Sequence, residues 1–135
     1  MSLGLENEYR MNLNQVTVGS KDVERSVRFY QQLGLRLIVF SPPRYARFEC
    51  PEGDSTFSIH QLETDLPCNG TVVYFESASL DAEVNRLLSE GIVFDSMLED
   101  QPWLWREASL RDPDGNKIIL YSAGENRRNP PWRIQ

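Results

Sequence analysis

The sequence predicts an α+β fold made of two tandem βαβββ modules, and three observations support this prediction. The two halves of the chain show the same order of strand and helix patterns. A Pro-acid-Gly turn stands at the same place in each half, as Pro51-Glu52-Gly53 and as Pro113-Asp114-Gly115. The 135 residues, 40% of them hydrophobic, suffice for one compact domain with a real core. We expect module one at about 12–62, module two at about 70–122, and an extended C-terminal tail at 123–135.

Module one begins with a predicted strand over 14–18, and a helix follows it. Ser20 or Asp22 can cap this helix, and Gly34 ends it. Apolar residues recur at helical spacing between the cap and this glycine, namely Val23, Val27, Tyr30 and Leu33. Three more strands are predicted over 35–40, 45–49 and 56–60, with turns at 42–43 and 51–54.

Module two repeats this order with a strand over 71–76 and a helix capped by Ser79 and ended by Gly91. Strands are predicted over 92–94, 106–110 and 117–121. The connection 98–105 is longer and more aromatic than its counterpart 41–44, which favours a loop that covers the mouth of a cleft. The tail cannot be a helix or a central strand, and we expect it to pack extended with Trp132 as its anchor.

Each module should form a curved four-stranded sheet with its helix on the outer face. Pairing the two sheets edge to edge gives an eight-stranded, partly open barrel-like sheet with the helices outside. Its concave inner surface would be the natural ligand site.

Composition narrows the function classes. With 14 basic and 20 acidic side chains the net charge is −6, which repels nucleic acid. The same charge would help gather a cationic ligand, or it could serve only to keep the protein soluble. The longest apolar runs are a few residues, too short to span a bilayer, and no secretory leader is recognisable. We therefore expect a cytoplasmic protein without membrane or nucleic-acid partners. Cys50 and Cys68 are interpreted as free thiols, although the sequence leaves a disulfide between them open.

Two motifs resemble a known family. Residues 15–30 contain Asp22-Val23-Glu24-Arg25-Ser26 after a strand and Phe29-Tyr30 near the helix end, and 112–115 is an Asp-Pro-Asp-Gly turn before the last strand. Within a duplicated βαβββ pattern, this combination resembles the vicinal-oxygen-chelate superfamily of glyoxalases, bleomycin-resistance proteins and extradiol dioxygenases. The resemblance covers 14–121 and implies a homodimer.

The resemblance also implies where metal ligands would stand. Metalloenzymes of the superfamily place His, Glu or Gln at four inward positions, which here fall on Gln15, Ser58, Val72 (or Thr71 after a one-residue slip) and Ile119. Only Gln15 matches that ligand set, because valine and isoleucine have no donor atom. The sequence therefore predicts no metal and no other cofactor.

Strand alternation puts a mixed set of side chains on the predicted inner surface. The candidate ligand-binding residues are Gln15, Thr17, Arg47, Ser58, His60, Tyr74, Trp103, Trp105, Ile119 and Tyr121. His60 is the only histidine and hence the candidate for acid–base catalysis. The alternatives stay open: the inward side chains could simply fill space, the tryptophans could lie in a subunit contact, and Arg47 and Arg106 could be exposed rather than clamp an anion.

The leading hypothesis is a metal-free protein that binds a cationic or aromatic small molecule, similar to the bleomycin-resistance branch. The alternative is a metal-dependent or His60-dependent lyase or dioxygenase-type enzyme of the same superfamily. A third class, a structural or regulatory interaction partner, would bind no small molecule saturably.

Overall fold

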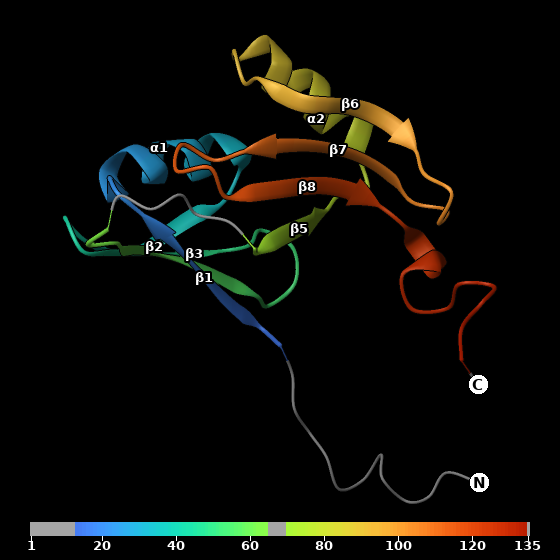
Figure 1. Cartoon of the computed structure of the whole chain (residues 1–135), viewed down its shortest axis with the longest axis horizontal. Helices are drawn as coiled ribbons and strands as arrows, with labels where there is room; N and C mark the ends of the chain where they lie inside the picture. The colour runs from blue at the N-terminus through green and yellow to red at the C-terminus, as the bar shows by residue number, and fades with distance from the viewer. Residues whose placement is uncertain (1–12, 65–69, 135) are drawn as a thin grey trace, which may run out of the picture.

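The computed structural model describes residues 13–64 and 70–134 and shows the two predicted modules (Figure 1). Module one consists of β1 (Gln15–Ser20), α1 (Val23–Leu33), β2 (Arg36–Ser41), β3 (Tyr45–Glu49) and β4 (Thr56–Gln61). Its strands form a sheet in the order β1-β4-β3-β2, in which β1 is parallel to β4 and the other pairs are antiparallel.

Module two repeats this topology. It consists of β5 (Val72–Glu76), α2 (Leu80–Ser89), β6 (Phe94–Asp100), β7 (Arg106–Arg111) and β8 (Lys117–Ser122), and a short 3-10 helix, η2 (Gly124–Asn126), follows. The sheet order is β5-β8-β7-β6, again with one parallel pair at β5 and β8. The βαβββ repeat is thus confirmed. Within the described residues the strands form two separate four-stranded sheets that do not close into a barrel.

The ends of α1 follow from local chemistry. Asp22 is the N-cap, and its carboxylate accepts a hydrogen bond from the backbone N–H of Arg25 at 3.1 Å. Gly34 ends the helix in the left-handed conformation, with φ 110°, where a side chain would be strained. In α2, Ser79 occupies the N-cap position, but its side chain makes no capping hydrogen bond. No helix among the described residues is long and apolar enough to cross a membrane.

One hydrophobic core joins both modules. Each helix turns its buried apolar residues toward one face of its own sheet, and the two sets belong to a single cluster. Phe57 of β4 contacts Phe75 of β5 across the modules, with ring centroids 5.7 Å apart. Because strand side chains alternate, burial of this face leaves the opposite face of each sheet for other contacts.

The Asp112-Pro113-Asp114-Gly115 turn of module two is buried against α1 of module one. The side chain of Asp114 is fully buried, and its Oδ2 accepts hydrogen bonds from the hydroxyls of Ser20 at 2.6 Å and Ser26 at 2.8 Å. Its Oδ1 accepts from the backbone N–H of Lys21 at 2.6 Å and from Nη2 of Arg25 at 3.2 Å. The turn therefore holds the two modules together.

Asp112 completes this connection. Its Oδ2 accepts hydrogen bonds from the hydroxyl of the fully buried Tyr30 at 2.7 Å and from Nδ2 of Asn116 at 2.8 Å. Asn116 in turn donates to the backbone oxygen of Gly19 at 2.9 Å. Buried carboxylates are tolerated here because every one of these oxygens has donors.

Two sequence-based expectations were wrong, and one concerns a residue outside the described ranges. The predicted strand 92–94 is displaced, because β6 runs from Phe94 to Asp100 and takes up the first three residues of the expected loop 98–105. Trp132 does not anchor the tail, since its side chain is 58% exposed. The turn predicted at 42–43 is present between β2 and β3, and it contains a cis peptide bond between Pro42 and Pro43. Cys50 is a half-buried free thiol, and Cys68 lies outside the described residues.

Candidate functional site

Two sheet faces carry the candidate residues. In sheet one, Thr17, Ser58 and Arg47 lie in one cross-strand row, and His60 lies beside Tyr45 in the next. Their neighbours along each strand are buried in the core, so these residues share the face turned away from α1. We call this the polar face, defined by Gln15, Thr17, Tyr45, Arg47, Ser58 and His60.

The polar face is organised by a chain of hydrogen bonds. The hydroxyl of Thr56 donates to Oε1 of Gln15, which turns the amide Nε2 of Gln15 toward Ser58. That Nε2 donates to the Ser58 hydroxyl at 2.7 Å, and Ser58 lies 2.7 Å from the hydroxyl oxygen of Tyr45. Nε of Arg47 donates to the same Tyr45 oxygen at 2.8 Å. Five side chains from three strands are thereby linked to one another.

Tyr45 is the residue that the sequence-based list missed. Burial raises the pKa of its phenol, but the hydrogen bonds from Ser58 and Arg47 and the positive charge of Arg47 outweigh burial and hold the pKa below its ordinary value. Strand parity was the available signal, because Tyr45 stands two residues before Arg47 and therefore on the same face.

His60 is exposed at the edge of this face, opposite Tyr45 in the sheet register. Within residues 13–64 and 70–134 its side chain has no hydrogen-bond or ion-pair partner. No described carboxylate orients its ring, so its contacts give no sign of an acid–base role. A catalytic role for His60 stays a prediction without support from its contacts.

The corresponding face of sheet two is aromatic. Trp105 stacks on Tyr121 with ring centroids 4.6 Å apart and an interplanar angle of 22°. Tyr74 meets both rings edge-on, at 5.9 Å from Trp105 and 5.6 Å from Tyr121. Ile119 is buried beneath this group, and Tyr74 is 47% exposed. We call this the aromatic face, defined by Tyr74, Trp105, Ile119 and Tyr121.

Two carboxylates border the aromatic face. Glu76 and Glu107 stand on either side of Tyr121 in the register of β5, β8 and β7. Burial, the charge of Glu76 and the neighbouring Tyr74 raise the pKa of Tyr121, against a smaller opposing effect of Arg127. Glu76 lies 3.8 Å from Nε of Arg127, which offsets part of its charge, whereas Glu107 has no ion-pair partner among the described residues.

The expected aromatic loop over a cleft is a tight turn instead. The backbone N–H of Gln101 donates to the oxygen of Trp105 at 2.7 Å, and that of Leu104 donates to Gln101 at 3.0 Å. Trp103 is 44% exposed and its indole N–H donates to Glu107 at 2.8 Å, so it lies next to the aromatic face. Trp105 is held by its donation to the backbone oxygen of Asn126 at 3.1 Å.

The four positions implied for a metal do not form a ligand set. Ser58 is fully buried and bonded to Gln15 and Tyr45, while Val72 and Ile119 offer no donor atom. Among the described residues, no three His, Cys, Asp or Glu side chains converge on a point where an ion could bind. The residues present do not fit the divalent metal of the superfamily's enzymes.

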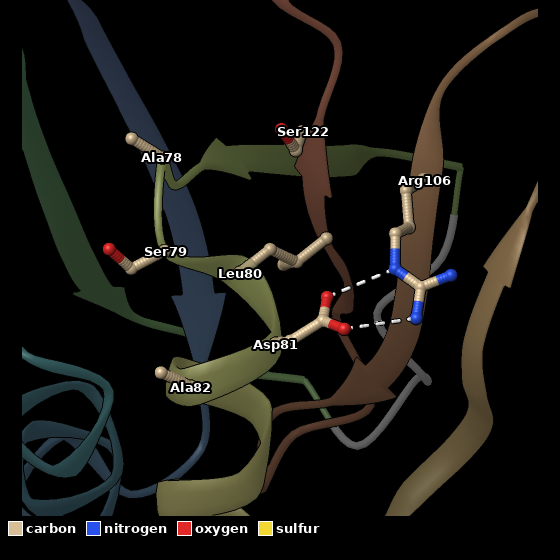
Figure 2. A pocket seen from close by; sticks show the side chains of 7 residues that line it. All are labelled: Ala78, Ser79, Leu80, Asp81, Ala82, Arg106 and Ser122. Carbon is tan, nitrogen blue, oxygen red and sulfur yellow. Dashed lines mark hydrogen bonds and ion pairs between the residues drawn. The ribbon is translucent and has the colours of Figure 1, made fainter.

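Arg106 does not belong with Arg47, although the two occupy comparable strands. It lies on the α2 side of sheet two and forms two hydrogen bonds with Asp81, at 3.0 and 3.1 Å (Figure 2). A further bond to Asp100 at 3.1 Å completes its pairing, and these bonds raise the pKa of Arg106 and lower that of Asp81. An open cavity of about 290 Å³ lies here, lined by Ala78, Ser79, Leu80, Asp81, Ala82, Arg106 and Ser122.

Comparisons with known proteins agree with this architecture. A lactoylglutathione lyase from Agrobacterium tumefaciens is 16% identical with a TM-score of 0.71, and the match covers 89% of this chain and 98% of that one. A glyoxalase/bleomycin resistance protein/dioxygenase from Nocardioides is 23% identical, with 98% and 97% coverage and a TM-score of 0.71. TioX from Micromonospora sp. ML1 is 21% identical, with 84% and 99% coverage and a TM-score of 0.67.

At these identities the solved structures establish the fold alone. No curated protein matches the sequence. The family model of the Glyoxalase/Bleomycin resistance protein/Dioxygenase superfamily, however, matches residues 12–120 and so covers both modules. This chain therefore belongs to the glyoxalase/bleomycin resistance protein/dioxygenase superfamily.

Proposed function

We propose that this protein binds a small cationic, aromatic molecule on the aromatic face and does so without a metal. The observation that carries the proposal is the cluster of Trp105, Tyr121 and Tyr74 beside two carboxylates. The exposed Tyr74 and the half-buried Trp105 present ring surface to solvent, and the buried Tyr121 supports them. A ring of the ligand can stack on such a surface, and a positive charge on it is attracted to the ring faces.

The distribution of charge supports a cationic ligand. Residues 70–122 carry ten acidic and four basic side chains, whereas residues 12–62 carry five acidic and six basic ones. The acidic excess of the two modules is therefore concentrated in the module that bears the aromatic face. Its field draws cations toward Glu76 and Glu107, an effect that salt screens over about 10 Å at 0.1 M.

Metal independence is supported by donor chemistry. Two of the four implied metal positions are aliphatic, and the hydroxyl of Ser58 is already engaged with Gln15 and Tyr45. Metal content of protein purified without chelator, measured by elemental mass spectrometry, tests this part. Stoichiometric tightly bound zinc, nickel, manganese or iron would overturn it and favour a lyase or dioxygenase-type enzyme.

We also propose a cytoplasmic homodimer without nucleic-acid or membrane partners. β1 and β5 are each at the edge of their sheet, and Val72 on β5 is 41% exposed. An open strand edge next to exposed apolar side chains is a surface that a second copy can cover. Light scattering coupled to size exclusion should give about twice the 15.6 kDa of the chain, and a monomer mass would contradict the proposal.

Calorimetric titration tests ligand binding. N-methylquinolinium, a planar cation, should bind saturably and more tightly than quinoline, the neutral ring of the same size. The Trp105→Leu variant should weaken binding roughly tenfold, because a desolvated cation–π contact contributes about 1–2 kcal/mol. Trp132→Leu is the matched control, since Trp132 is an exposed tryptophan that is not part of the aromatic face.

If Trp105→Leu and Trp132→Leu bound N-methylquinolinium with equal affinity, the ligand would not bind at the aromatic face. Equal binding of the cation and the neutral ring would contradict the cationic ligand class while leaving an aromatic one. If Trp105→Leu unfolds, Tyr74→Ala provides the same test at a half-exposed position.

A further inference from the structure

We propose that Tyr45 and Arg47 form an oxyanion-binding subsite on the polar face, which takes a carboxylate or phosphate group of a ligand. This subsite is separate from the aromatic face, and the inference goes beyond the proposed function because it does not require a cationic ligand. Its basis is the hydrogen-bond arrangement around Ser58, which leaves the hydroxyl proton of Tyr45 for an external acceptor.

The arrangement follows from counting donors. Thr56 fixes the amide of Gln15, so Gln15 donates to Ser58 and does not accept from it. The proton of Ser58 then needs an acceptor, and the Tyr45 oxygen at 2.7 Å is the one that the described residues supply. If Tyr45 donated to Ser58 instead, a fully buried hydroxyl proton would lose its partner, which costs about 1–3 kcal/mol.

Tyr45 therefore accepts two hydrogen bonds, one from Ser58 and one from Nε of Arg47. Its own O–H is the spare donor of the group, and it belongs to a half-buried side chain on the open side of the sheet. The lowered pKa of Tyr45 agrees with an oxygen that accepts twice beside a positive charge. A phenol polarised in this way is a strong donor to an anion.

Arg47 supplies the charge. Its guanidinium carbon lies 5.4 Å from the centroid of the Tyr45 ring, so the two side chains are held together. Among the described residues only its Nε has a hydrogen-bond partner, and both terminal nitrogens remain available in the fork geometry that suits carboxylate and phosphate.

The surroundings favour an anion at this point. Glu49 shares the polar side of β3, but Arg36 lies 3.8 Å from it and offsets its charge. His60 borders Tyr45 and adds no negative charge. Module one as a whole is nearly neutral, unlike module two, so the acidic balance of the chain does not oppose an anion here.

The test is an NMR titration of the full-length protein with inorganic phosphate and, separately, acetate, at constant ionic strength in chloride. We expect saturable shifts of the Arg47 Nε–Hε resonance and of β3 and β4 amides. Tyr45→Phe and Arg47→Gln should each weaken binding about fivefold or more, the equivalent of one hydrogen bond of about 1 kcal/mol. Arg28→Gln, which removes an exposed arginine of α1 on the other side of sheet one, is the control and should bind as wild type.

The outcomes distinguish a specific subsite from non-specific anion binding. Saturation by phosphate but not acetate supports the subsite with a phosphate-type ligand, and the reverse supports it with a carboxylate. Unsaturable shifts spread over several arginines, a loss in Arg28→Gln equal to that in Arg47→Gln, or wild-type affinity of Tyr45→Phe would overturn the proposal. Arg47 is exposed, so Arg47→Gln keeps the test valid if Tyr45→Phe fails to fold. Trp105→Leu should leave anion binding unchanged, which separates this proposal from the aromatic site.

Discussion

Replacing Asp114 by asparagine tests whether the buried turn holds the modules together. Oδ1 of Asp114 accepts from Lys21 N–H and Arg25, and Oδ2 accepts from the hydroxyls of Ser20 and Ser26. An amide has one oxygen, so it can serve one pair of donors while its NH₂ group faces the other pair. The substitution also removes the negative charge that faces Arg25.

The expected loss is about 2–4 kcal/mol of unfolding free energy. Hydrogen bonds to a charged group contribute about 1.5–3 kcal/mol each, but the serine hydroxyls can rotate to accept from the new amide, and Arg25, whose side chain is 43% exposed, can be solvated again. Urea unfolding followed by circular dichroism measures the change.

Glu52 provides the matched control, because it occupies the position of Asp114 in the corresponding turn of module one and is exposed. Glu52→Gln should change the unfolding free energy by no more than about 0.5 kcal/mol. Equal unfolding midpoints for Asp114→Asn and Glu52→Gln would refute the reasoning, since burial of the carboxylate is the one difference on which it depends.

Three further predictions follow from other contacts. Tyr30→Phe should destabilise the fold by about 1.5–3 kcal/mol in urea unfolding, because it removes a buried donor to the Asp112 carboxylate, and an unchanged midpoint would contradict this. Gly19→Ala should lower the melting temperature, because its Cβ would meet the Leu62 side chain at 2.6 Å, and Gly19→Ala combined with Leu62→Ala should show a smaller loss than the two variants summed. In an alkaline absorbance titration, subtracting the Tyr45→Phe and Tyr121→Phe curves from wild type should show Tyr45 ionising before Tyr121. The folded-state pKa of Tyr45 is below its unfolded value, so ionisation of Tyr45 favours the folded state as pH rises. The raised pKa of Tyr121 acts in the opposite direction. If Tyr121 ionised before Tyr45, the two environments would be misassigned.

The elements that the sequence predicted well are those in which a local pattern reports burial. Val23, Val27 and Tyr30 recur at helical spacing because that face of α1 enters the core, and Asp22 and Gly34 bound the helix through their own backbone and side-chain preferences. These signals act within a few residues and need no knowledge of the rest of the chain.

The extent of β6 was not predictable in this way. It is an edge strand paired with β7 alone, and most of its residues, including Ser96 and Met97, are exposed or half-exposed. Without a buried face, a strand shows no apolar alternation, so its polar sequence resembled a loop.

The burial of the Asp112–Gly115 turn could not be predicted from the sequence for a different reason. Two aspartates beside a proline and a glycine are typical of an exposed turn, and the counterpart with Glu52 is exposed. Only the docking of this turn on Ser20, Ser26 and Tyr30, more than eighty residues earlier in the chain, supplies the donors. Periodicity carries no information about such partners.

The candidate site was predictable by strand parity, and the contacts among its residues were not. Alternation correctly put Gln15, Thr17, Ser58 and His60 on one sheet face. It could not show that Ser58 would be fully buried by its neighbours, or that Tyr45 would receive two hydrogen bonds there. Those features depend on side-chain orientations that the cross-strand register sets.

Two of the positions implied for a metal carry residues that pack or hydrogen-bond within the two sheet faces. Ile119 occupies one of these positions, where it packs against Tyr121 and Trp105 and so supports the aromatic face. Ser58 likewise joins Gln15 to Tyr45 and orients the phenol. Replacing Ile119 by glutamate would therefore bury a charge against aromatic rings. We expect this to lower the free energy of unfolding by several kcal/mol, whether or not a metal binds. Ile119 and Ser58 are therefore each matched to their neighbours in a sheet face, and we expect a ligand to bind at these two faces.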